Sequence, residues 1–180
     1  MKRQHAFHSF SIVILLTFVT AISAAETIAN KKAPEFTQKS SHEWINSPPL
    51  SMKQLKGNVV LLDVWAYGCW NCYRSFPWLH KLEKTYASKK LKVIGIHTPE
   101  FEQEQNRENV IANVRRFELR HPIMMDNNFA YWKALENQYW PTFYLIDKKG
   151  NLRFRFIGET HAGDRNATTI DQAIKLLLKE

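Results

Sequence analysis

The sequence predicts a three-layer α/β sandwich, in which helices cover both faces of a central sheet. Two apolar runs rich in branched residues, 57–65 and 91–97, have the composition of strands that are buried on both faces. A segment with helical periodicity separates them, so together they predict a βαβ unit with parallel strands. Two further apolar runs between 142 and 157 predict a hairpin, which a last helix follows. An inserted helix and short strand are expected between the βαβ and ββα halves.

The first 25 residues have the pattern of an export signal. Lys2 and Arg3 precede an apolar run from Phe10 to Ile22, and small residues follow it. A membrane span needs about 20 apolar residues, so this run is short for one. We therefore expect cleavage near Ala25 and a soluble exported protein, with an uncleaved N-terminal anchor as the alternative.

The remainder of the chain predicts one domain. Residues 26–40 are polar and are expected to form a flexible lead-in, and residues 41–180 are enough for a single core. The whole chain has 25 Lys and Arg against 17 Asp and Glu, which gives a formal net charge of +8. These basic residues are scattered, so we interpret them as solvated surface and expect no nucleic-acid partner. We expect a monomer.

The helix after the first strand has a clear periodicity. It is expected from Cys69 to about Ser88, and its apolar residues recur at every third or fourth position on one face. Pro77 lies inside this helix and removes one of its hydrogen bonds, which predicts a kink there.

The second half of the sequence predicts shorter elements. Residues 106–119 place apolar side chains on one helical face, and residues 121–128 predict a short strand that ends in a turn. The remaining elements, in order, are a short helix at 129–135, strands at Thr142–Ile146 and Leu152–Ile157 around a turn at 147–151, and a helix from about Thr169 to Lys179 with Thr169 and Gln172 as a capping-box pair.

Both cysteines of the chain, Cys69 and Cys72, lie in one CxxC motif just after the first strand. As a structural disulfide, the pair would stabilise little, because it closes a short loop and the entropy removed from the unfolded chain grows with loop length. A structural zinc ion usually takes four nitrogen or sulfur ligands, and one CxxC supplies two. A CxxC that opens a helix inside a βαβ unit is instead typical of a redox pair.

The two cysteines are expected to have different roles. Cys69 should lie at the helix N-terminus with its sulfur exposed, where free N–H groups and the helix dipole stabilise a thiolate. We therefore predict that Cys69 is the attacking sulfur. Cys72 lies deeper in the first turn, from which it can reach and resolve the mixed disulfide.

The sequence around the cysteines resembles a known family. The segment LLDVWAYGCWNCYRSFP (61–77) is similar to the active-site segment of the thioredoxin superfamily, and YWPTFYLIDKKGN (139–151) resembles the segment that places the superfamily's cis-proline beside the cysteines. Within the superfamily, the chain from about Ala33 onward looks like the TlpA/ResA-like proteins, and most like the C-terminal redoxin domain of DipZ-type proteins. The family's usual Gly-Pro between the cysteines is Trp70-Asn71 here, so the redox potential does not carry over.

This resemblance implies roles for further residues. Asp63 would be the proton acceptor for Cys72, which explains an acid in an otherwise apolar strand, where an uncompensated charge is costly. Pro141 would be the cis-proline, although a proline can also simply begin a strand. Trp140 would offer its backbone to an extended substrate peptide. Glu100 aligns with an active-site glutamate of the ResA-like group, and a solvated loop acid is the alternative.

For two tryptophans and one histidine near the motif, a purely structural role is an alternative to a functional one. Trp65 and Trp70 are each either packing residues or exposed platforms for a partner. His97, at the end of the second strand, is interpreted as structural.

Three classes of function compete. We favour a thiol-disulfide oxidoreductase that acts on protein thiols and disulfides. A thiol peroxidase is the first alternative, but such enzymes place their cysteine in a Pro-x-x-x-Thr-x-x-Cys setting, whereas residues 65–68 are Trp-Ala-Tyr-Gly. A metal-carrying thiol protein is the second, and no convergent His or Met cluster is visible for it. We expect no cofactor and no metal.

The resemblance also implies a compartment and partners. It favours a reductant in the bacterial periplasm that receives electrons from a membrane donor and serves apocytochrome c maturation. An oxidant that works in the opposite direction would use the same residues, so both directions stay open.

Overall fold

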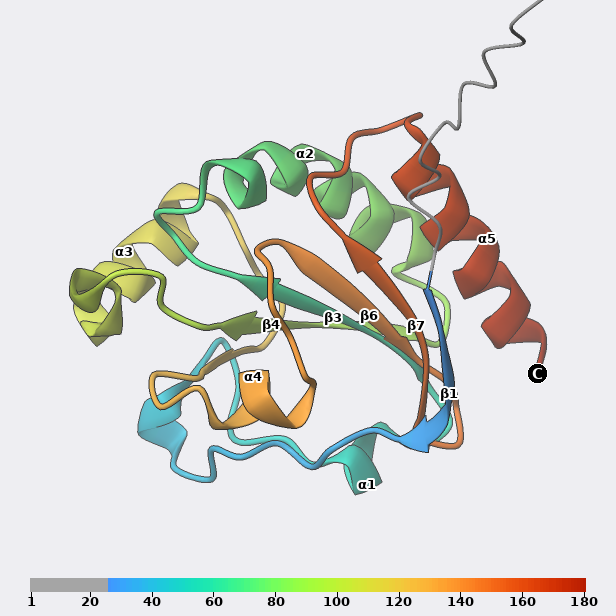
Figure 1. The fold of residues 1–180 in the computed structure, drawn as a ribbon, viewed down its shortest axis with the longest axis horizontal. Helices are drawn as coiled ribbons and strands as arrows, with labels where there is room; N and C mark the ends of the chain where they lie inside the picture. The colour runs from blue at the N-terminus through green and yellow to red at the C-terminus, as the bar shows by residue number, and fades with distance from the viewer. Residues whose placement is uncertain (1–25) are drawn as a thin grey trace, which may run out of the picture.

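The computed structural model describes residues 26–180, which form one mixed sheet with helices on both faces (Figure 1). The predicted export signal lies outside these residues. The order of the strands in the described sheet is β1-β7-β6-β3-β4-β5-β2. The strands are β1 (Glu26–Lys32), β2 (Trp44–Ile45), β3 (Val59–Trp65), β4 (Leu91–His97), β5 (Ile123–Met125), β6 (Thr142–Ile146) and β7 (Asn151–Ile157).

Five α-helices and two short 3-10 helices connect the described strands. They are α1 (Met52–Leu55), α2 (Trp70–Tyr86), α3 (Arg107–Arg116), α4 (Ala130–Ala134), α5 (Arg165–Lys179), η1 (Ser41–Glu43) and η2 (Glu102–Gln105). Within residues 26–180, no helix is both long enough and apolar enough to cross a membrane.

The centre of the sheet has the predicted topology. Strand β3 pairs in parallel with β4, and α2 connects them, which confirms the βαβ unit. On its other side β3 pairs antiparallel with β6, and β6 continues into β7 as the predicted hairpin. The insertion between the two halves consists of η2, α3, β5 and α4. In the β3–β4 register, Asp63 lies opposite Gly95.

Alternate residues of β3 enter two separate hydrophobic cores, which confirms the three layers. Val59, Leu61 and Trp65 pack on the side covered by α2, α3 and α5. The residues between them face α1 and α4 on the other side. Figure 1 shows these two groups of helices on opposite faces of the sheet. Both faces of β3 are therefore buried, as its continuous apolar run predicts.

The first and last long helices follow the sequence pattern to different degrees. Helix α2 begins after Cys69 and contains Pro77, as predicted, and the kink at Pro77 stays a prediction. Helix α5 begins at Arg165, a full turn before the predicted start, because Asp164 is its N-cap and accepts the N–H of Ala167. The predicted capping box is therefore wrong: Thr169 lies inside the helix, where its hydroxyl donates to the carbonyl of Arg165.

The segment expected to be a flexible lead-in is part of the fold in the structure. Residues Glu26–Lys32 form β1, which pairs antiparallel with β7 at one edge of the sheet. Phe36 is fully buried and packs against the rings of Trp44 and Tyr131, each with its centroid 5.3 Å away. A few apolar residues anchor this polar segment to the core. They are too few to show a periodicity, so the sequence pattern does not reveal the anchor.

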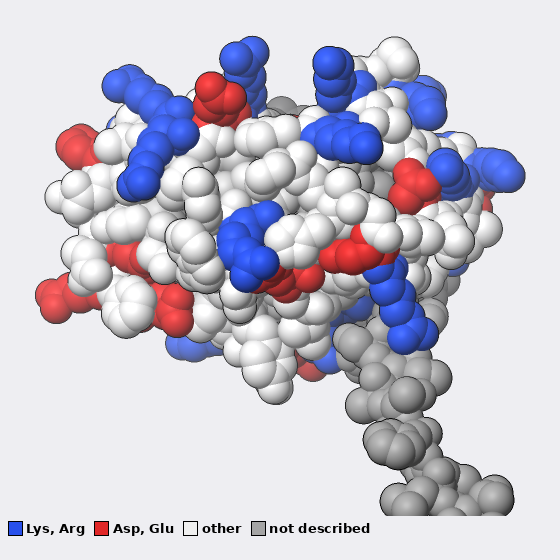
Figure 2. All heavy atoms as spheres, turned by 90° about the horizontal axis from the view of Figure 1, so that it is seen from above, with Lys and Arg blue, Asp and Glu red and all other residues white. Residues whose placement is uncertain are grey.

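On the face that Figure 2 shows, the charged side chains are scattered, as the sequence predicts. Figure 2, which looks onto the molecule from above the view of Figure 1, shows Lys and Arg interspersed with Asp and Glu and separated by uncharged residues. This face therefore has no continuous basic surface of the kind that binds a nucleic-acid backbone.

Candidate active site

The two cysteines form a disulfide at the start of α2, directly after β3. Cys69 is the N-cap residue of α2, and its Sγ accepts the backbone N–H of Cys72 over 3.1 Å. Cys69 is 7% exposed and Cys72 is 1% exposed. The more accessible cysteine is thus at the helix N-terminus, as predicted, but Cys69 is much less exposed than expected.

Helix α2 provides the electrostatic environment of Cys69. It is 17 residues long and has no acidic residue in its first turn. Its N-terminal N–H groups and its dipole therefore favour a negative charge on Cys69 when the disulfide is reduced, and the N–H of Cys72 already points at that sulfur.

A buried acid that sequence reasoning missed holds the loop before Cys69. Glu104, from η2, is fully buried, and its Oε1 accepts the backbone N–H of Gly68 over 2.6 Å. Its Oε2 accepts the N–H groups of Glu100, over 2.6 Å, and Phe101, over 3.2 Å. A Cβ atom on Gly68 would lie 2.4 Å from this carboxylate, so only glycine allows the contact. Glu104 thus ties the cysteine loop to the loop after β4.

The role expected of Glu100, the acid predicted in this loop, stays a prediction. Its side chain is exposed and forms no hydrogen bond or ion pair within residues 26–180. The chain turns so that the backbone N–H of Glu100 donates to Glu104, while its own carboxylate faces solvent. One sequence signal could have found Glu104: it lies three residues after the cap position of η2, where a capping box has an acid. The residue at that cap position is Phe101, whereas a capping box has Ser or Thr there, so the pattern is not recognisable.

Asp63 lies on β3, on the face that α2 covers. It is 1% exposed, and its Oδ2 has no hydrogen-bond partner within the described residues. Burial raises the pKa of Asp63 from 3.8 to about 7, His121 lowers it and Glu83 raises it. A carboxyl group with a pKa near 7 can both take and release a proton at neutral pH, which suits the predicted proton acceptor.

Two aromatic rings beside Asp63 are structural. Trp65 is fully buried and meets the rings of Phe76 and His97 edge-on, with centroids 5.5 and 4.9 Å away. It offers no surface to a partner, so the packing alternative holds for Trp65. His97 is also fully buried, and burial lowers its pKa to about 3, which keeps the ring neutral.

Trp70, between the cysteines, is exposed. Trp70 is 65% exposed. Its ring lies against Tyr73 at 5.3 Å, and Tyr73 lies against Phe117 at 5.4 Å. Tyr73 and Phe117, but not Trp70, line a hollow of about 420 Å³ between α2 and the end of α3. Trp70 therefore can serve as a platform for a partner.

The peptide bond between Trp140 and Pro141 is cis, as the resemblance implies. Thr142, the next residue, pairs with Val64 at the end of β3, so Pro141 lies at the end of the sheet where the cysteine loop starts. The indole N–H of Trp140 donates to the carbonyl of Thr98 over 3.0 Å, which fixes this loop to the end of β4.

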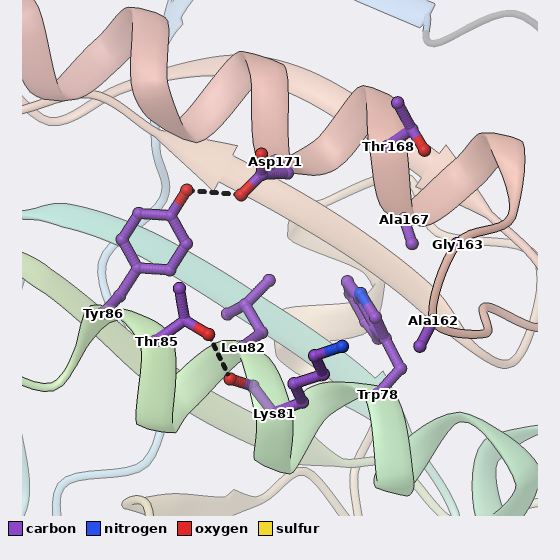
Figure 3. Close-up of a pocket in the computed structure, with 10 residues that line it drawn as sticks. All are labelled: Trp78, Lys81, Leu82, Thr85, Tyr86, Ala162, Gly163, Ala167, Thr168 and Asp171. Carbon is purple, nitrogen blue, oxygen red and sulfur yellow. Dashed lines mark hydrogen bonds between the residues drawn. The ribbon is translucent and has the colours of Figure 1, made fainter.

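A cavity elsewhere in the domain lies away from this chemistry. About 240 Å³ opens between α2 and α5, and its lining includes Trp78, Lys81 and Asp171 but neither cysteine (Figure 3). Tyr86 donates to Asp171 across it over 2.5 Å. Within residues 26–180, no group of three or more His, Cys, Asp or Glu side chains could hold a metal ion.

The family of the chain follows from its match to a protein-family model. A family model described as Redoxin matches residues 28–174. The chain belongs to the redoxin family. This redoxin domain has the fold and the vicinal cysteine pair of thiol-disulfide oxidoreductases.

Curated relatives and a solved structure agree with this family. Protein DipZ of Mycobacterium tuberculosis is 42% identical over 128 residues, which cover 69% of this chain and 18% of DipZ. The redoxin chain therefore spans less than a fifth of that relative's length. Thiol-disulfide oxidoreductase YkuV of Bacillus subtilis is 24% identical over 147 residues, 82% of this chain and 94% of YkuV. The fold matches a putative thiol:disulfide interchange protein DsbE from Chlorobium tepidum with a TM-score of 0.71 at 21% identity, over 85% of this chain and 99% of that one.

Proposed function

We propose that this redoxin is an exported thiol-disulfide oxidoreductase that exchanges disulfides with protein partners through Cys69 and Cys72. The observation that carries the proposal is the geometry of the pair: a disulfide at the N-terminus of α2, with a cis-proline at the same end of the sheet. Its position in the family and the exposed ring of Trp70 support it.

The exchange uses the two sulfurs in sequence. The Cys69 thiolate attacks a partner disulfide, forms a mixed disulfide and releases one partner sulfur as a thiolate. Cys72 then loses its proton and attacks Cys69 Sγ. The Cys69–Cys72 disulfide forms, and the second partner sulfur leaves as a thiolate. The partner is reduced by two electrons and the redoxin is oxidised by two.

Asp63 takes the proton from Cys72 in this scheme. Its carboxylate is buried on the face that carries α2, and its pKa of about 7 allows it to accept a proton at neutral pH. Because a thiolate attacks and a thiol does not, the transfer is needed before Cys72 can resolve the mixed disulfide.

A trapping experiment tests the roles of the two cysteines. Cys72→Ser should still attack but cannot release its partner, so mixed disulfides should accumulate with proteins of the native compartment. Cys69→Ser is the matched control and should trap none. Equal trapping by both variants would contradict the assigned roles. A peroxide-consumption assay on the wild-type protein separates this function from that of a thiol peroxidase.

The direction of electron flow and the compartment belong to the same proposal. We place the protein in the bacterial periplasm as a reductant, supplied by a membrane electron donor and acting on apocytochrome c, and the signal pattern in residues 1–25 and the sequence resemblance support this placement. Equilibration with glutathione measures the potential. A value near about −270 mV, as in thioredoxin, would support a reductant, and a value near about −120 mV would show an oxidant. A reporter fused to the chain should be active outside the cytoplasm.

A further inference from the structure

The carboxylate of Asp126 lies at the end of β5 and joins three segments of the chain. Asp126 is fully buried, and its own N–H donates to the carbonyl of His97 on β4 over 2.8 Å. Its Oδ1 accepts the N–H of Tyr131 over 2.9 Å, and its Oδ2 accepts the N–H of Trp132 over 2.8 Å. Oδ2 also accepts the hydroxyl of Thr98, just after β4, over 3.3 Å. One side chain thus connects β5, the start of α4 and the loop after β4.

The two residues that donate to Oδ2 of Asp126 both contact the indole of Trp140. The carbonyl of Thr98 accepts the indole N–H of Trp140 over 3.0 Å. The ring of Trp132 lies against the same indole, with the ring centroids 4.2 Å apart. The indole is therefore held at its nitrogen and on one face, and the residues that hold it are themselves bound by one carboxylate oxygen.

The backbone of Trp140 has unpaired groups at the end of the sheet where the cysteine loop starts. The carbonyls on either side of it are engaged: that of Tyr139 accepts the amide of Asn137, and that of Pro141 accepts the N–H of Gly158. Within residues 26–180, neither the N–H nor the carbonyl of Trp140 forms a hydrogen bond. An extended chain can pair with such groups, as an added strand pairs with the free edge of a sheet.

We propose that Asp126 is a positioning residue that holds Trp140 and cis-Pro141 where they bind the backbone of a partner chain. This inference rests on the proposed function, and it states how the site recognises its partners: the extended segment around the partner's disulfide pairs with the backbone of Trp140. The pairing orients the partner's sulfur for the attack by Cys69. A small disulfide without a peptide backbone gains nothing from it.

A role limited to capping α4 explains less. Asp126 does accept two N–H groups of that helix, which a helix start needs. However, a cap does not have to be buried: Ser40 and Asp164, the N-caps of η1 and α5, are not. Burial of a carboxylate is costly unless hydrogen bonds compensate for it. The third bond to Asp126, from Thr98, lies outside the helix and leads to the loop of Trp140, so capping does not account for it.

The test compares two disulfides that release the same coloured aromatic thiolate. One is a small symmetrical aromatic disulfide. The other is an unstructured peptide whose single cysteine is joined to the same aromatic thiol. In both reactions the Cys69 thiolate forms a disulfide with the substrate, and one aromatic thiolate leaves with the electron pair of the broken bond. The leaving group is therefore matched, and the peptide chain is the difference.

Two variants loosen these contacts to different degrees. In Asp126→Asn, an NH₂ group replaces one acceptor oxygen, so at least one of the three donors loses its partner. Thr98→Val removes only the hydroxyl, keeps the carbonyl that binds Trp140, and keeps the test decisive if Asp126→Asn does not fold. We expect thiolate release from the peptide to slow about tenfold in Asp126→Asn and less in Thr98→Val, whereas the small disulfide reacts at the wild-type rate.

Asp171→Asn is the matched control. It changes a carboxylate that accepts the hydroxyl of Tyr86, beside a cavity that neither cysteine lines. It should change neither rate.

A methylated peptide separates recognition of the backbone from a loss of folding. Methyl groups on the backbone nitrogens around its cysteine remove donors that pair with Trp140. This peptide should react about tenfold more slowly than its parent with the wild type, and as fast as its parent with Asp126→Asn, where the pairing is already lost.

Several outcomes would overturn the proposal. Wild-type rates with the peptide in both variants would do so, as would an equal fall with both disulfides. So would a methylated peptide that reacts like its parent with the wild type, or that is slowed by the same factor in the wild type and in Asp126→Asn. A wild-type protein that reacts with neither disulfide, or that does not close the Cys69–Cys72 disulfide after the attack, would instead contradict the proposed function itself.

Discussion

Asp63 is the residue at which function and stability oppose each other most directly. The folded state raises its pKa from 3.8 to about 7, mainly because burial disfavours the charged form. Above about pH 4 the unfolded chain releases this proton, whereas the folded protein holds it until about pH 7. Folding is therefore penalised progressively as the pH rises through that window, and the penalty stays constant above it.

Replacement of Asp63 by Asn should remove this penalty. The shift of about three pKa units corresponds to at most about 4 kcal/mol, so we expect Asp63→Asn to be more stable than the wild type at pH 8 by up to that amount and equal to it near pH 3. Urea unfolding at the two pH values measures the difference. The same variant should resolve mixed disulfides more slowly. An equal gain in stability at both pH values would show that the charge is not its cause.

The residues that could be predicted from sequence are those within recognisable local patterns. Cys69 and Cys72 form a motif, and Pro141 precedes a strand in a familiar segment. Glu104 was missed in favour of Glu100 because sequence shows that a loop contains acids and does not show which one points inward. The contact between His121 and Glu83, which both affect the pKa of Asp63, could not be predicted, because the two residues are 38 positions apart and meet only when β5 lies beside β4.

At the scale of elements, the loop after β4 acts as a support for the loop after β3. Three backbone N–H groups from the two loops converge on the single carboxylate of Glu104. The contact requires that Gly68 have no side chain, since a Cβ atom there would approach the carboxylate oxygen to 2.4 Å. Cys69 follows Gly68 directly, so the position of the Cys69 sulfur depends on this contact.

We expect Gly68→Ala to disturb the site through Glu104. The added methyl group must displace either the buried carboxylate or the cysteine loop, which should cost about 1–3 kcal/mol of stability. The attack of Cys69 on an aromatic disulfide, measured by the release of the first coloured thiolate, should slow, because Cys69 moves with the loop. Glu100→Gln is the control and should behave like the wild type in both measurements. Wild-type rates in Gly68→Ala would show that the loop adapts without moving the cysteine.

Long periodic elements were predicted well, and short ones were not. The strands β3 and β4 and the helix α2 have apolar patterns that extend over seven residues or more, so their type and order could be predicted. The strand β2 has two residues and η2 has four, which are too few to show a period. The early start of α5 was hidden because its first turn is polar, and Asp164 was not recognised as its cap.

At the scale of the whole molecule, we expect a monomer. Both hydrophobic cores are closed by helices. The large exposed apolar side chains of the described residues come from several elements and loops, and they are Trp70, Tyr73, Phe101, Tyr139, Ile157 and Leu176. We expect light scattering to give the mass of one chain over a wide range of concentrations. Trp70→Ser should leave this mass unchanged. If the wild type is a dimer and Trp70→Ser dissociates it, the surface around Trp70 is an interface between copies.

The two edges of the sheet have a consequence for the proposed exchange of disulfides with other protein chains. The edge strand β2 has only two residues, and the pairing of the opposite edge strand, β1, shifts in register between Thr27 and Lys31. The exposed Lys31 and Lys32 place positive charge on that second edge. Neither edge therefore offers a long regular row of free backbone groups, which is what a foreign strand needs to add itself to a sheet. If the proposed exchange takes place, a partner chain with exposed strands can therefore approach the disulfide without adding itself to the edge of this sheet and aggregating with the domain.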